Sequence, residues 1–341
     1  MNPISLQQII PVLLSLTPVI LFLGILKLLD SFKLLRMRDV LLAILIGTAA
    51  AMISYFINRF FLGTVKLNLK HYSQFDAPLI EETLKGMYIF YLIRANRVGF
   101  RIDIAIYGFA LGAGFALVEN VFYLHAITDS NPLLWIVRGF GTAIMHGGTT
   151  AIFGILAKTD VDQRQSAQFL SFFPGLAVAM ILHAVYNHFI LPPLIMTGLL
   201  ILTLPVLFYL IFQQSERSTR RWLDIGFDTD QELLNIITTD KMSDSKIGLY
   251  LKSLKESYPA EVILDMICYM RLYLELSIKA KGMLMMREMG FDPEPDATLK
   301  PALEEMVFLE KSIGKTGMMT VSSFLSVRSQ DIWQLKLLAQ K

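Results

Sequence analysis

Acidic, imidazole and amide side chains recur at one-turn helical spacing along the first two-thirds of this 341-residue chain. The four groups are Glu81-Glu82-x-x-Lys85, Phe115-x-x-x-Glu119-Asn120, His146-x-x-x-Thr150 and His183-x-x-x-Asn187. Each lies in a long apolar stretch, where an ionisable side chain is costly and generally faces a cavity or a bundle interior. Carboxylates and imidazoles around water suit hydrolysis, because a carboxylate can take a proton from water while His and Asn donors hold an oxyanion.

Two chemical schemes are open for these groups. No serine or cysteine stands beside a membrane histidine as a nucleophile, so attack by activated water is the simpler scheme. A carboxylate with two histidines, here Glu119, His146 and His183, is also a familiar zinc ligand set. The residues alone do not separate glutamate catalysis from metal catalysis. They also allow a structural role for Glu81, since acids in a first helical turn complement its dipole and Glu81 can pair with Lys85.

Seven apolar stretches must position these side chains. A helix needs about 20 mostly apolar residues to cross hydrocarbon, and seven stretches reach or approach that length. They are 9–29, 40–62, 77–93, 104–126, 133–157, 168–190 and 194–212. The first has neither the basic start nor the cleavage site of a signal peptide, so we expect it to be an anchor. The third is the weakest, because it contains Glu81, Glu82 and Lys85.

The basic residues favour seven spans over six. With seven, twelve Lys and Arg fall on one side of the membrane and four on the other, and positive charge marks the cytoplasmic side. The prediction is an outer N-terminus and a cytoplasmic C-terminal part. Glu81, Glu82, Glu119, His146 and His183 then all lie between the outer surface and the middle of the membrane. One shared cavity explains that common depth.

Charge divides the chain in two. Only 24 of residues 1–213 are charged, against 36 of residues 214–341. We therefore predict an all-α protein with a membrane bundle over 1–213 and a soluble helical domain over 214–341 that binds a cytoplasmic partner or regulates the bundle. A net charge of +2 argues against nucleic-acid binding, and a single cysteine, Cys268, excludes an internal disulfide.

The four groups resemble the successive motifs of PrsW-type intramembrane proteases, which belong with the CAAX-protease and bacteriocin-processing superfamily. The resemblance covers 78–187 and departs from the wider superfamily at Glu119, where histidine is usual, and at Lys85, where arginine is common. It implies a glutamate-centred peptidase without a required cofactor, in a bacterial cell (inner) membrane. Its substrates would be single-span membrane proteins such as anti-sigma factors, cut near the outer face.

By motif position the resemblance also implies a role for each residue. Glu81 would be the general base, and Glu82 and Glu119 would support the base or the water. His146, His183 and Asn187 would position water or stabilise the oxyanion, with Lys85, Phe115, Asn120 and Thr150 in support.

Two other functions compete with the peptidase. Intramembrane acids and histidines can relay protons in a transporter or channel, although the paired broken helices of many transporters are not evident. His146 and His183 could alternatively be axial ligands of a haem, which would leave the neighbouring acids without a purpose.

Overall fold

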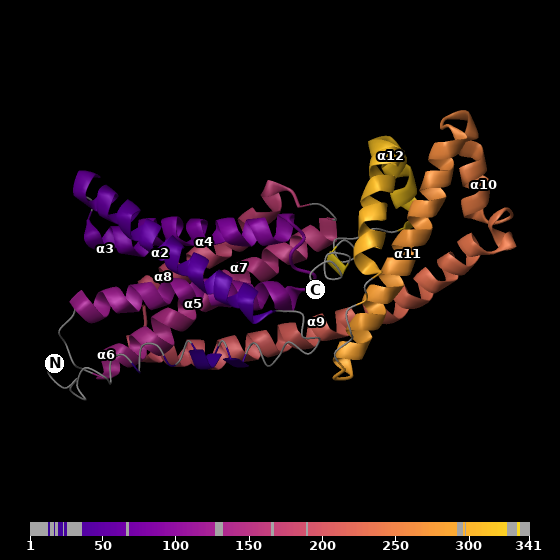
Figure 1. The fold of residues 1–341 in the computed structure, drawn as a ribbon. Helices are drawn as coiled ribbons and strands as arrows, with labels where there is room; N and C mark the ends of the chain where they lie inside the picture. Colours follow the sequence, from indigo (N-terminus) through magenta and orange to yellow (C-terminus); the bar gives the residue numbers. More distant parts are fainter. Residues whose placement is uncertain are drawn as a thin grey trace, which may run out of the picture. The chain divides into compact units, whose positions relative to one another are not determined.

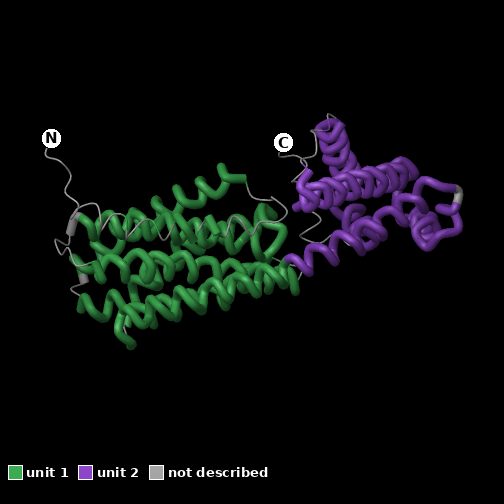
Figure 2. Tube along the Cα trace, turned by 90° about the horizontal axis from the view of Figure 1, so that it is seen from below, with its two compact units in different colours: residues 1–215 green, residues 216–341 purple. Residues whose placement is uncertain are grey.

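The computed structural model describes residues 36–65, 68–126, 132–164, 167–188, 190–291 and 298–325, together with scattered positions between 13 and 25, Asp296, Trp333 and Gln334. Every regular element within these residues is a helix (Figure 1). The all-α prediction is therefore confirmed. Two compact units, residues 1–215 and 216–341, divide the chain (Figure 2).

Five helical stretches of the described chain are long and apolar enough to cross a membrane. The first two are Met37–Thr64 in α2 (Met37–Val65) and Arg101–Leu124 in α5 (Arg101–Ala126). The third, Pro132–Arg164, comprises α6 (Pro132–Ile136), η2 (Val137–Thr142) and α7 (Ala143–Arg164). The fourth, Phe169–Asn187, comprises η3 (Phe169–Phe172) and α8 (Phe173–Asn187), and the fifth, Pro193–Thr238, is α9. All five overlap predicted spans. The chain is a multi-pass membrane protein.

The count of seven rests on two further segments. The predicted span 9–29 lies outside the described residues apart from scattered positions. The predicted span 77–93 is a helix, α4 (Ala77–Arg94), which follows α3 (Leu69–His71) and the π-helical η1 (Tyr72–Asp76). With Glu81, Glu82, Lys85 and Arg94 in 18 residues, α4 is too charged to qualify by composition alone.

Helix α5 is the centre of the first unit, packed against α2 on one side and α7 on the other (Figure 1). Glycines make these contacts possible. A Cβ atom at Gly108 would lie 2.8 Å from the Ala151 Cα, and one at Gly112 would lie 2.7 Å from the Gly147 Cα. Gly108 and Gly112 are one helical turn apart, a spacing that predicts a close backbone approach. The approach is present, and it brings His146 of α7 up to α5.

The second unit is a helical assembly with its own apolar core. It contains the end of α9, η4 (Asp240–Met242), α10 (Lys246–Ser253), η5 (Leu254–Glu256), α11 (Ala260–Glu288) and α12 (Leu299–Leu325). Buried Met266, Met270 and Leu274 of α11 face Leu309 and Ile313 of α12 within that core. The apolar residues after Pro259 recur with helical period and predict a helix, which is α11. A second helix is predicted over about 300–312; α12 runs past that end and kinks at Gly314. A third is predicted near 330–338, of which only Trp333 and Gln334 are described.

Replacing Gly112 with alanine tests the contact between α5 and α7. The new methyl group would force the two backbones apart, and overpacking of this kind costs about 1–3 kcal/mol. We expect Gly112→Ala to unfold at lower temperature in detergent. Gly198→Ala on α9 is the matched control, because nothing lies within 4 Å of its Cβ position, and we expect it to be as stable as the native chain or more so. Equal melting of the two variants would contradict this packing.

Candidate active site

Four helices of the first unit supply the polar cluster. Glu81, Glu82 and Lys85 come from α4, Glu119 from α5, His146 from α7 and His183 from α8. The fold thus brings side chains from four helices together, as their shared depth in the membrane predicted. Pro78 in the first turn of α4 starts that helix one turn before the two acids.

Glu82 is the most tightly held carboxylate of the cluster. Its Oε1 accepts from Lys85 Nζ at 2.6 Å and lies 2.8 Å from His183 Nδ1 and 3.2 Å from the Thr149 hydroxyl. The side chains of Glu82 and Lys85 have no exposed surface. Such contacts offset part of the cost of burying an ion pair, and here they tie α4 to α7 and α8; Glu82 Oε2 is buried without a hydrogen-bond partner among the described residues.

A second chain of contacts runs through His146. His146 Nδ1 lies 3.2 Å from Lys85 Nζ, and its Nε2 lies 2.7 Å from Glu119 Oε2. The other oxygen of Glu119 accepts from Arg138 at 3.1 Å, and the Arg138 guanidinium stacks 3.5 Å from the centre of the Tyr123 ring. Glu119 is therefore held by a histidine on one side and an arginine on the other.

Glu81 differs from the other two acids because no Lys or Arg among the described residues lies within ion-pair distance of it. Its polar contacts include the Asn58 amide at 3.5 Å and His183 Nε2 at 3.8 Å. Asn58 is itself fixed by the Tyr72 hydroxyl at 2.8 Å. Three carboxylates thus share two cations, Lys85 and Arg138, and the carboxylate left over is Glu81.

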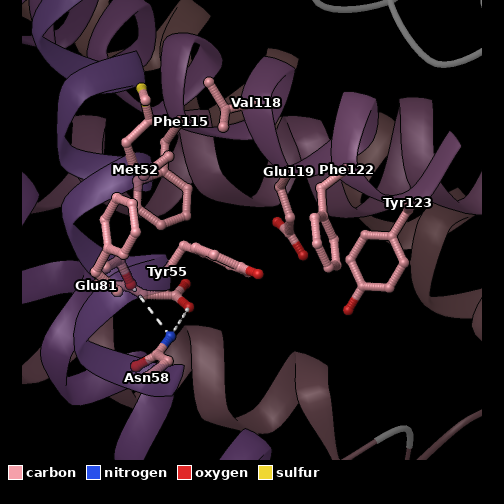
Figure 3. Close-up of a pocket in the computed structure, with 12 residues that line it drawn as sticks. Met52, Tyr55, Asn58, Glu81, Phe115, Val118, Glu119, Phe122 and Tyr123 are labelled. Carbon is pink, nitrogen blue, oxygen red and sulfur yellow. Dashed lines mark hydrogen bonds between the residues drawn. The ribbon is translucent and has the colours of Figure 1, made fainter. Parts of the chain in front are cut away.

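A cavity of about 380 Å³ opens beside these acids, between α2, α4 and α5 (Figure 3). The carboxylates of Glu81 and Glu119 point into it (Figure 3). The rest of the lining is largely apolar or aromatic and includes Met52, Phe115 and Val118. The cavity can accommodate an apolar peptide segment next to two carboxylates.

The remaining predicted residues take different positions. Phe115 lines the cavity, with its ring 5.0 Å from that of His146, and Asn120 is buried beside Glu119. Within the described part of the chain, the Thr150 hydroxyl bonds only the His146 carbonyl of its own helix, at 2.9 Å. The Asn187 amide donates to the Ser73 carbonyl of η1 at 2.9 Å and so braces the start of α4 without contacting the acids.

Sequence reasoning missed four residues that hold the cluster: Asn58, Tyr72, Arg138 and Thr149. The position of Arg138 near the outer end of its span indicates a structural anchor when the sequence is considered alone. An arginine and a glutamate that lie within one or two helical turns of the same depth in the membrane are expected to form an ion pair. Asn58 and Tyr72 lie outside every motif, and only the fold brings them to Glu81.

Carboxylates and imidazoles gathered in a bundle of membrane-spanning helices, beside a cavity, define the class of intramembrane hydrolases. A family model confirms this assignment: residues 36–212 match the PrsW family of intramembrane metalloproteases, and the chain belongs to that family. It is accordingly a hydrolase acting on peptide bonds. Curated proteins and solved structures give no match.

Family membership sets aside the transporter and haem hypotheses. The geometry also speaks against a haem, because the His146 and His183 rings lie edge to face with their centres 4.8 Å apart. That separation leaves no room for a macrocycle between them.

A metalloprotease needs side chains that can ligate a metal ion. Glu81, His146 and His183 have ligating atoms within 4.8 Å of one another; the sequence had suggested Glu119 in place of Glu81. A carboxylate and two imidazoles suit zinc, and His183 fits well, since Glu82 at its Nδ1 is the kind of partner that orients a ligating ring. His146 does not fit as placed, because Lys85 and Glu119 occupy both of its nitrogens.

Two adjacent threonines test the geometry around Glu82. Thr149→Val removes a hydroxyl that contacts the buried carboxylate, and a hydrogen bond to a charged group contributes about 1.5–3 kcal/mol. Thr150→Val removes only a bond to a carbonyl of its own helix and should cost less than about 1 kcal/mol. Unfolding in detergent should therefore show a clear loss for Thr149→Val alone. A larger loss for Thr150→Val would contradict the arrangement.

Proposed function

We propose that this chain is an endopeptidase that cuts single-span membrane proteins near the outer membrane face, with Glu81 as the base that activates water. The observation that carries the proposal is the surplus carboxylate: Glu81 lines the cavity and has no cationic partner in the described chain, whereas Glu82 and Glu119 are each held by a cation and a histidine. A base must be free to accept a proton, and Glu81 is the acid in that position.

The reaction follows from this arrangement. Glu81 takes a proton from water, and the resulting hydroxide attacks the carbonyl carbon of the substrate. When the carbon–nitrogen bond breaks, the same proton passes to the leaving amine, and His183, whose Nε2 lies 3.8 Å from Glu81 Oε2, stands beside that transfer. Glu82 is a positioning residue here, since it touches His183 and not the cavity.

The cavity supports a membrane-embedded substrate. Met52, Tyr55, Phe56 and Phe122 line it and are also exposed on the outside of the bundle. Its mouth is therefore apolar and lies between α2 and α5, where a helix in the lipid could enter without crossing water. The apolar membrane segment of a single-span protein, such as an anti-sigma factor, matches this apolar entrance.

The membrane orientation completes the proposal. With α4 and the segment 9–29 counted, seven helices cross a bacterial inner membrane, the N-terminus lies outside, and the second unit lies in the cytoplasm. Helix α4 has 18 residues and at a rise of about 1.5 Å per residue is about 27 Å long, close to the thickness of the hydrocarbon. The second unit would bind a cytoplasmic partner or regulate cleavage.

Substitution of Glu81 tests the role of the base. Glu81→Gln keeps the size and the Asn58 contact but cannot accept a proton, so cleavage should fall at least about 100-fold, the scale of general-base catalysis. Membrane proteomes of cells with equal amounts of native and Glu81→Gln protein would reveal single-span proteins truncated near the outer surface only with the native chain. Asp76→Asn, at the end of η1, is the matched control and should cleave normally. Identical proteomes for native and Glu81→Gln would refute the proposal.

A second variant tests the cavity as the place where substrate binds. Val118→Phe adds a ring to the cavity wall, so a substrate with a large apolar residue beside the cut bond should be cleaved about 10-fold more slowly. A substrate with alanine there should be cut nearly as fast as before. Val121→Phe, one turn along α5 on its exposed side, should leave both rates unchanged. Equal loss for both substrates would place the bound segment elsewhere.

A further inference from the structure

Lys85 stands at the junction of the two chains of contacts in the site. Its Nζ lies 2.6 Å from Glu82 Oε1 and 3.2 Å from His146 Nδ1, and 5.0 Å above the Phe115 ring. The side chain has no exposed surface. Because Lys85 forms an ion pair with Glu82 inside the bundle, its amine is the ammonium form, which has three hydrogens to donate and no lone pair.

This contact decides where the proton of His146 sits. A neutral imidazole has one donor nitrogen and one acceptor nitrogen. Since the ammonium of Lys85 can only donate, His146 Nδ1 must accept, and the ring hydrogen is on Nε2. That hydrogen points at Glu119 Oε2, 2.7 Å away, which is a carboxylate acceptor. Both contacts of His146 are satisfied by this tautomer and by no other neutral one.

His183 is held in the opposite tautomer. Its Nδ1 lies 2.8 Å from Glu82 Oε1, and a carboxylate oxygen that already pairs with Lys85 accepts a hydrogen, so the ring hydrogen is on Nδ1. The lone pair of Nε2 then faces Glu81. The two histidines, with ring centres 4.8 Å apart, therefore present different atoms to their surroundings.

We propose that Lys85 is a positioning residue that fixes His146 as a hydrogen-bond donor to Glu119 and thereby keeps it from ligating a metal ion. A metal held by His146 Nε2 needs the ring hydrogen on Nδ1, where it would meet the ammonium of Lys85 donor to donor. Lys85 and a metal ion thus compete for His146, while His183 keeps a free nitrogen towards Glu81. The inference uses the site proposed above, but its tests do not depend on cleavage.

The tautomers can be read directly in the native protein. The chain has five histidines, so selective ¹⁵N-histidine labelling in detergent micelles gives a small set of ring signals, which His146→Gln and His183→Gln assign. We expect the hydrogen on Nε2 in His146 and on Nδ1 in His183. A hydrogen on Nδ1 of His146, or a doubly protonated His146 ring, would overturn the proposal.

Zinc binding provides the second test. Lys85→Met removes the ammonium at nearly constant length and frees His146 to change tautomer, so the affinity of purified, metal-stripped protein for Zn²⁺ should rise at least 10-fold in calorimetric titration. The gain should vanish in the double variant Lys85→Met/His146→Gln. Lys85→Arg, which keeps a charged donor, should bind Zn²⁺ as the native chain does.

Two results of the Zn²⁺ titrations would overturn the proposal. If the native chain binds Zn²⁺ tightly and His146→Gln abolishes that binding, Lys85 does not keep His146 from the metal. An unchanged affinity in a folded Lys85→Met chain would overturn the proposal too. If Lys85→Met does not fold, the ring signals of the native protein decide. If Glu81→Gln showed that the peptidase proposal is wrong, the ring-hydrogen and Zn²⁺ measurements would still test the role of Lys85.

Discussion

The buried ion pair of Glu82 and Lys85 is the constraint on which the rest of the site depends. Two opposite charges three residues apart on α4 are removed entirely from solvent, and hydrogen bonds to the pair offset part of the cost of that removal. His183 and Thr149 contact Glu82 Oε1, and His146 contacts Lys85, whereas Glu82 Oε2 has no hydrogen-bond partner among the described residues. The position of α4 relative to α7 and α8 is therefore set by one pair of side chains.

The backbone must come close enough for these short side chains to meet. Threonine and histidine on α7 reach α4 only because α7 lies deep in the bundle, and glycines at the α5–α7 contact allow that depth. In lipid, small residues at helix contacts provide packing that apolar surface alone does not. The glycines and the ion pair thus both position α7.

The sequence predicts the helices and the clustered acids and histidines well, because both are local properties. Hydropathy locates α2, α5, α7, α8 and the first half of α9, and their common depth predicts one cluster. Rotation about a helix axis is harder to predict. The π-helical η2 (Val137–Thr142) adds an extra residue to a turn and so rotates Gly139 relative to the residues of α7, away from the face expected for an unbroken helix. Within α7 the motif position pointed to Thr150, but its neighbour Thr149 is the residue that contacts Glu82. The contacts of Asn58 and Arg138 required the fold itself.

In our proposal, glutamate and metal chemistry at this site differ in which ring nitrogen of His146 carries the hydrogen. Glu81 and the Nε2 atom of His183 are both lone-pair donors directed to the same space, and either a proton or a cation satisfies them. The third member of the candidate metal-ligand set, His146, is the one in contact with a lysine. A lysine in that position adds a positive charge next to the place where a cation would bind, and it also removes the acceptor that the cation would use. Both effects act in the same direction, so in our proposal the residue at position 85 determines which of the two chemistries the same acids and histidines favour.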